Sequence, residues 1–71
     1  MKRHHSPYIE SSKSIQIMIM DDPPGDGHEV YYRMAGYPFI FAFELPVYLT
    51  LNEVIVYARA NSDYYAEVLF K

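Results

Sequence analysis

The segment "LTLNEVIVYARAN", residues 49–61, limits the fold most, because it starts like a helix and has almost no polar side. Thr50 is followed three residues later by Glu53, which is the spacing of a capping box, and Asn61 is a suitable residue for the helix end. On a helical wheel the apolar residues occupy two sides, with Leu51, Val54, Ile55 and Ala58 on one and Val56, Tyr57 and Ala60 on another. Such a helix needs apolar neighbours on both sides.

A strand is the alternative for the middle of this segment. The run from Val54 to Tyr57 is rich in β-favouring residues, and a short apolar run cannot be assigned by periodicity alone. The capping signals nevertheless favour the helix.

The length and composition indicate one small domain that gains stability by association. A chain of 71 residues is near the lower limit for a self-sufficient core, and without cysteine it can form no disulfide. We therefore expect a homodimer. The net charge of -3 argues against direct binding to nucleic acid. Because we find no transmembrane segment or signal peptide, we expect a cytoplasmic protein without a membrane partner.

Alternating apolar residues predict a hairpin in the first half of the chain. Residues 14–20 carry isoleucines at every second position, and residues 28–36 carry Val30, Tyr32 and Met34 on one face. The intervening "DDPPGDG" predicts a turn. The polar residues 1–13 are expected to be a flexible N-terminal segment.

Two further segments complete the predicted fold. "YPFIFAFELPVY", residues 37–48, is expected to be an edge strand or an extended apolar flap, and "DYYAEVLFK", residues 63–71, is expected to be a strand. The predicted fold class is α+β, with one helix packed on a three- to four-stranded antiparallel sheet. Residues 14–71 would form a single β-β-(β)-α-β domain. Either the flap or another protein would cover the outer side of the helix.

No catalytic, metal-binding or cofactor-binding motif can be assembled from the sequence. A nucleophile elbow, a phosphate-binding loop and paired metal ligands are all missing. Asp21, Asp22 and Asp26 do not have the spacing of a calcium-binding EF-hand loop. We therefore expect a protein-binding protein that is not an enzyme and needs no metal or cofactor.

Two fragments of the chain resemble the small uracil-DNA glycosylase inhibitors of Bacillus phages. "IQIMIMDD" followed by "DGHEVYYRMAG" is similar to their first hairpin, and "LTLNEVIVYARANSDYYAEVLF" is similar to their helix and last strand. The resemblance covers about two thirds of the chain. The shared residues include Asp21, Asp22, Asp26, Gly27, Tyr31, Gly36, Leu49, Thr50, Leu51, Glu53, Val56 and Asp63.

The resemblance implies a homodimer of β-β-α-β protomers whose two helices frame an apolar pocket. The target enzyme flips uracil out of DNA and inserts a leucine into the duplex. The pocket would capture that leucine while acidic groups imitate DNA phosphates in the host cytoplasm. The expected contact residues are Glu53, Val54, Ile55, Tyr57, Ala58, Tyr31, Asp21 and Asp22.

The chain departs from this family at helix positions that matter for the pocket. Val54 stands where the family has phenylalanine, Ile55 where it has glutamate, and Ala58 where it has tyrosine. Residues 37–48 have no counterpart, so their phenylalanines Phe39, Phe41 and Phe43 are candidates to line the pocket. Core packing is the alternative role of Val54, Ile55 and Tyr57, and helix capping is that of Glu53.

Two other functions stay open at this point. The same helix surface could block a different host enzyme. A single-strand nucleic-acid binder could instead stack bases on tyrosines, for which the candidates are Tyr31, Tyr32, Tyr64 and Tyr65.

Overall fold

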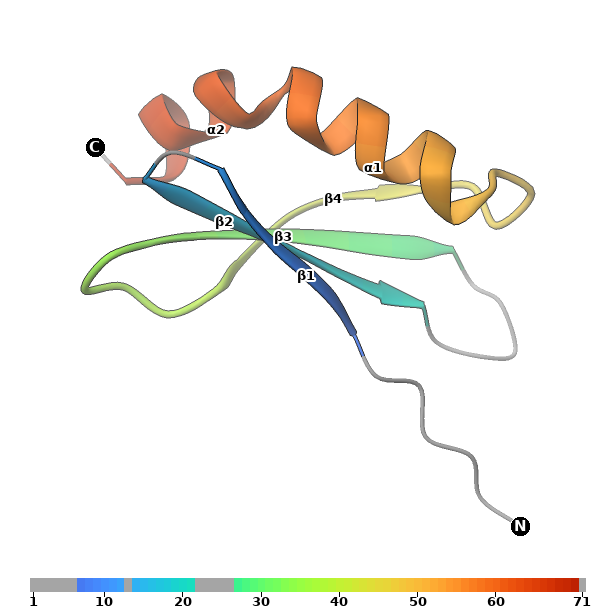
Figure 1. Ribbon diagram of the computed structural model, residues 1–71, viewed down its shortest axis with the longest axis horizontal. Helices are drawn as coiled ribbons and strands as arrows, with labels where there is room; N and C mark the ends of the chain where they lie inside the picture. The colour runs from blue at the N-terminus through green and yellow to red at the C-terminus, as the bar shows by residue number, and fades with distance from the viewer. Residues whose placement is uncertain (1–6, 13, 22–26, 71) are drawn as a thin grey trace, which may run out of the picture.

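The protein is a two-layer α+β structure in which two helices lie on one side of an antiparallel sheet (Figure 1). The computed structural model describes residues 7–12, 14–21 and 27–70. Four strands form the sheet in the order of the chain: β1 (Tyr8–Ser12), β2 (Ile15–Asp21), β3 (His28–Met34) and β4 (Ile40–Leu45). The helices α1 (Leu51–Ala60) and α2 (Ser62–Leu69) follow.

The predicted hairpin is confirmed as β2 and β3. Ile17 pairs with Tyr32 and Ile19 with Val30, so the apolar sides of both strands face the helices. Gly27, directly before β3, has a positive φ of 138°, a conformation that residues with a side chain rarely adopt. A Cβ there would also lie 2.8 Å from the carbonyl oxygen of Leu45, so this close approach to β4 requires glycine.

Strand β1 lies within the segment that the sequence predicts to be flexible. It pairs with β2, with Ile9 opposite Met18. Glu10 accepts two hydrogen bonds from the Arg59 guanidinium of α1, at 2.7 and 2.8 Å. This ion pair joins positions 49 residues apart, so no local pattern in "YIESS" could indicate it.

Residues 37–48 contribute an edge strand, β4, and not a flap over the helix. Val30 pairs with Phe43 but Tyr31 pairs with Phe41, which leaves Ala42 as the extra residue of a β-bulge. Because of this bulge, Phe43 faces the helices whereas Phe41 faces the opposite side. The regular alternation suggested by the phenylalanines is therefore broken.

Helix α1 starts at the predicted capping box. The Thr50 hydroxyl accepts from the Glu53 backbone N–H at 3.2 Å, and the Glu53 carboxylate accepts from the Thr50 N–H at 2.8 Å. Asn61 ends the helix as predicted, but its φ of -104° is not left-handed. Its side-chain Nδ2 instead donates to the Tyr57 carbonyl at 2.9 Å, which satisfies a backbone group of the last turn.

The prediction of a strand for residues 63–71 is wrong, because residues 62–69 form helix α2. Tyr65, Ala66 and Leu69 have helical spacing, and all three pack against the core. The Tyr65 ring stacks on Tyr32 at a centroid distance of 5.3 Å. In so short a segment, the apolar residues fit both the two-residue alternation of a strand and the roughly 3.6-residue repeat of a helix. The element order is therefore β-β-β-β-α-α, and it differs from the predicted β-β-(β)-α-β order.

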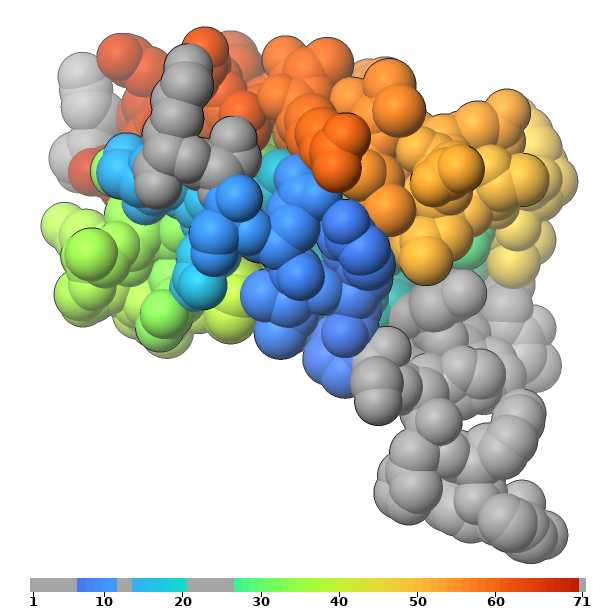
Figure 2. All heavy atoms as spheres, in the orientation of Figure 1, coloured from blue at the N-terminus to red at the C-terminus, as the bar shows by residue number. Residues whose placement is uncertain are grey.

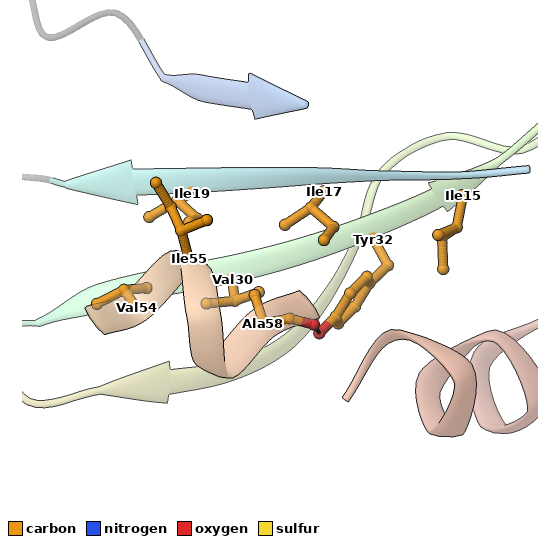
Figure 3. Packing of buried hydrophobic residues seen from close by; sticks show 8 residues of the cluster. All are labelled: Ile15, Ile17, Ile19, Val30, Tyr32, Val54, Ile55 and Ala58. Atoms are coloured by element: carbon orange, nitrogen blue, oxygen red, sulfur yellow. Dashed lines mark hydrogen bonds between the residues drawn. The ribbon is translucent and has the colours of Figure 1, made fainter. Parts of the chain in front are cut away.

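The core lies between the inner side of α1 and the central strands (Figure 3). Its buried residues are Ile15, Ile17, Ile19, Val30, Tyr32, Val54, Ile55 and Ala58. The Tyr32 hydroxyl donates to the Ala58 carbonyl oxygen at 2.6 Å, so the polar tip of this buried ring is satisfied. Burial raises the pKa of Tyr32 above its ordinary value, which keeps the hydroxyl a donor.

Replacing Thr50 tests the helix start. Thr50→Ala removes the acceptor for the Glu53 N–H and should lower the free energy of unfolding by about 1 kcal/mol. Thr50→Ser keeps a hydroxyl and should stay close to wild type. Equal urea midpoints for wild type and Thr50→Ala would show that this cap does not stabilise the fold.

The ion pair between Glu10 and Arg59 predicts a pH-dependent contribution to stability. Hydrogen bonds from the Arg59 guanidinium hold the pKa of the Glu10 carboxyl below its ordinary value of 4.5. The pair therefore stabilises the fold above pH 4.5, and this contribution disappears as the pH falls through the lower folded pKa. Thermal melts should show Glu10→Gln and Arg59→Gln less stable than wild type at neutral pH, with both differences closing in acid. A difference that is independent of pH would contradict this role.

Candidate protein-binding site

The outer side of α1 carries an apolar hollow with a volume of about 410 Å³. It is lined by Asn52, Glu53, Val56, Tyr57 and Ala60. Figure 2 shows the side chains of α1, in orange, and of the segment before it, in yellow, as one continuous surface above the sheet. The hollow is shallow and open to solvent, because all of its lining residues come from one helix.

The sheet positions this hollow by burying the opposite side of the same helix. Val54 and Ala58 are fully buried and Ile55 is 7% exposed, whereas Val56 is 62% exposed. Val54, Ile55 and Ala58 were expected to contact a partner, but they point into the core of their own chain (Figure 3). Their alternative role, core packing, is what the structure shows.

Tyr57 and Glu53 are the expected contact residues that do line the hollow. The Tyr57 ring packs edge-on against Phe43 at 5.5 Å, so strand β4 supports one wall. Phe43 is thus the one candidate among the three phenylalanines of residues 37–48 that reaches this side. Glu53 both caps the helix and lines the hollow, so its two proposed roles are compatible.

The apolar surface continues along α2. Tyr64 is 61% exposed and Val68 is 53% exposed on the helix layer. Tyr64 packs edge-on against Tyr65 at 4.9 Å, which links this exposed ring to the core. Exposed apolar side chains therefore extend beyond α1, as is typical of a surface that another molecule covers.

The helix layer is acidic. Residues 51–70 contain Glu53, Asp63 and Glu67, and their single basic residue, Arg59, is paired with Glu10 of β1. Net negative charge on the layer that carries the apolar hollow favours a partner with a basic surface.

The other expected contact residues lie elsewhere. Asp21 is the last residue of β2 and pairs with His28, whose Nε2 lies 2.9 Å from the Leu49 carbonyl oxygen just before α1. This end of β2 is therefore on the same side of the molecule as the start of α1. Asp22 lies outside the described residues. Tyr31 faces the side of the sheet away from the helices, where it packs edge-on against Phe41 at 5.6 Å.

The structure does not bring the four candidate tyrosines into one stacking platform. Tyr32 is fully buried and Tyr65 is stacked on it. Tyr64 is exposed on the helix layer, whereas Tyr31 is half-buried on the opposite side of the sheet. These tyrosines therefore do not form the shared base-stacking surface that a single-strand nucleic-acid binder would use.

Sequence reasoning missed Asn52, Val56 and Ala60 as lining residues. The helical wheel already placed Val56 and Ala60 on a different side of the helix from Val54, Ile55 and Ala58. The sequence therefore contained a signal for these two lining residues. The resemblance directed attention to the neighbouring positions Val54, Ile55 and Ala58 instead.

Within residues 7–12, 14–21 and 27–70, the structure contains no group of three or more histidine, cysteine or acidic side chains that could hold a metal ion. Over the same ranges, no helix is both long and apolar enough to cross a membrane. No protein-family model, curated protein or solved structure matches the chain.

A pair of adjacent substitutions tests which side of α1 is accessible. Ile55→Lys places a charge in the core and should destabilise the fold by several kcal/mol, enough to unfold a domain of this size. Val56→Lys adds the same charge on the outer side and should change stability by less than about 0.5 kcal/mol. Circular dichroism and urea titration measure both effects. A well-folded Ile55→Lys protein would contradict the assignment of the two sides.

Proposed function

We propose that the protein is a phage-type inhibitor of uracil-DNA glycosylase that acts as a homodimer in the host cytoplasm. The observation that carries this proposal is the open apolar hollow on α1, with Glu53 among its lining residues. The resemblance of the hairpin and of the capped helix α1 to the phage inhibitors adds support, although helix α2 stands where that family has its last strand.

The hollow supplies the apolar part of the proposed contact. The glycosylase inserts a leucine into the DNA duplex, and the same side chain would enter the hollow between Val56, Tyr57 and Ala60. Burial of one leucine side chain contributes roughly 1.5–3 kcal/mol. The resemblance implies a pocket between two helices, but this hollow lies on one α1. We therefore propose that a single protomer receives the leucine.

Acidic side chains supply the electrostatic part. An enzyme that binds DNA presents a basic surface, and the helix layer offers it Glu53, Asp63 and Glu67. Complementary charge speeds the encounter, while the buried apolar contact slows dissociation. Inhibition should therefore persist at moderate salt although association becomes slower.

A different host enzyme is the second candidate target. Any enzyme with a basic surface and a protruding apolar side chain fits the same hollow. Capture from a bacterial lysate, followed by identification of the bound protein, separates this case from glycosylase binding.

The direct test is uracil release by purified uracil-DNA glycosylase. Wild-type protein in molar excess should suppress release, and Val56→Lys should weaken suppression at least tenfold, because the lysine obstructs an apolar contact worth more than 1.4 kcal/mol. Ala35→Lys adds the same charge at an exposed turn between β3 and β4 and serves as the matched control.

Both variants should keep the wild-type circular-dichroism spectrum. Unchanged uracil release with excess wild-type protein would refute glycosylase inhibition. Equal effects of the two lysine variants would show that general charge, and not the hollow, determines binding.

A further inference from the structure

The sheet side away from the helices also carries an uncovered apolar row. Ile9, Met18, Tyr31 and Phe41 are successive cross-strand partners, so their side chains share one face across all four strands. Ile9 and Phe41 are each 50% exposed. Within the described residues, no helix lies on this side of the sheet (Figure 1).

Polar rows of different charge flank the apolar row. On one side Ser11, Gln16 and Arg33 are cross-strand partners, and Arg33 donates to the Gln16 side chain at 2.7 Å while lying over the Phe39 ring. On the other side Glu29 pairs with Glu44 beside Met20. The face is thus basic at one end of β3 and acidic at the other.

This charge pattern is complementary to its own copy in one orientation. If two such faces stack with a two-fold axis along the apolar row, each Arg33 lies over the partner's Glu29, and the apolar rows lie over one another. A two-fold axis along the strands would instead place Glu29 over Glu29. Stacked sheets are about 10 Å apart, a distance that side chains from both faces fill.

The helix layer is a poorer surface for a second copy. Its three acidic residues outnumber its one basic residue, Arg59, so two helix faces would bring a net like charge together. On the helix layer the single basic residue, Arg59, is already paired with Glu10, whereas on the sheet face Arg33 and Glu29 lie on either side of the apolar row. The charge therefore assigns the two uncovered faces to different partners.

We propose that two copies of this chain pair through their open sheet faces, with β3 over β3 and Arg33 of each copy beside Glu29 of the other. This interface rests on the homodimer of the proposed function and specifies how its two copies meet. It does not depend on which enzyme is bound. The result is a helix–sheet–sheet–helix arrangement. Both α1 hollows remain on the outside, so each dimer can hold two target molecules.

Charge reversal tests both the interface and its orientation. Size exclusion with light scattering at about 100 µM should give wild type twice the chain mass of 8.3 kDa. Arg33→Glu and Glu29→Arg should each place like charges opposite one another and reduce the mass to 8.3 kDa. The double variant Arg33→Glu/Glu29→Arg restores opposite charges and should recover the dimer. Val56→Lys, on the helix layer, should remain dimeric.

Several results would overturn this inference. These are a monomeric wild type, dimeric single variants, a folded double variant that stays monomeric, or a monomeric Val56→Lys protein. A wild-type monomer that retards a single-stranded oligonucleotide would assign the Tyr31 and Phe41 rings to base stacking. Circular dichroism confirms folding of each variant. Uracil release is read separately, so loss of the dimer and loss of inhibition are distinguishable.

Discussion

The contact between the inner side of α1 and strands β2 and β3 is the interaction on which the rest of the structure depends. Val54, Ile55 and Ala58 meet the isoleucines of β2 and Val30 of β3, and the Tyr32 hydroxyl fixes the helix through the Ala58 carbonyl. Once this side is buried, the rotation of α1 about its axis is set. Val56, Tyr57 and Ala60 must then face outward, so the same packing that forms the core also creates the hollow.

A chain this short has enough residues for two layers only, and this limit explains its exposed apolar surface. A sheet between two helix layers would be covered on both sides, but here both helices lie on one side. The outer helix side and the open sheet side each retain apolar residues. Their charges differ, because acidic Glu53 lines the helix hollow while Arg33 and Glu29 lie on either side of the open row along β3. We therefore propose a basic partner for one face and a second copy of the chain for the other.

Sequence reasoning succeeded where a local signal determined the structure. The alternating isoleucines predicted β2, and the spacing of Thr50 and Glu53 predicted the start of α1. Sequence reasoning failed where contacts between residues far apart in the chain determine the structure. β1 is held by pairing with β2 and by the Glu10 to Arg59 ion pair, and α2 is favoured because Tyr65 stacks on Tyr32. The bulge at Ala42, which separates Phe41 from Phe43, likewise appears only once β3 and β4 are paired.

The candidate site, too, could be predicted from local sequence only in part. The helical wheel separates Val54, Ile55 and Ala58 from Val56, Tyr57 and Ala60, but it cannot show which side the sheet will cover. Either side is apolar enough to be a core. The choice is made by shape and by hydrogen bonding, since Ala58 lets the Tyr32 hydroxyl reach the helix backbone, whereas the Tyr57 ring fits beside Phe43 at the edge. Ala58, a small residue, therefore lets one side of this apolar helix approach the sheet and leaves the other side, with Val56 and Tyr57, exposed.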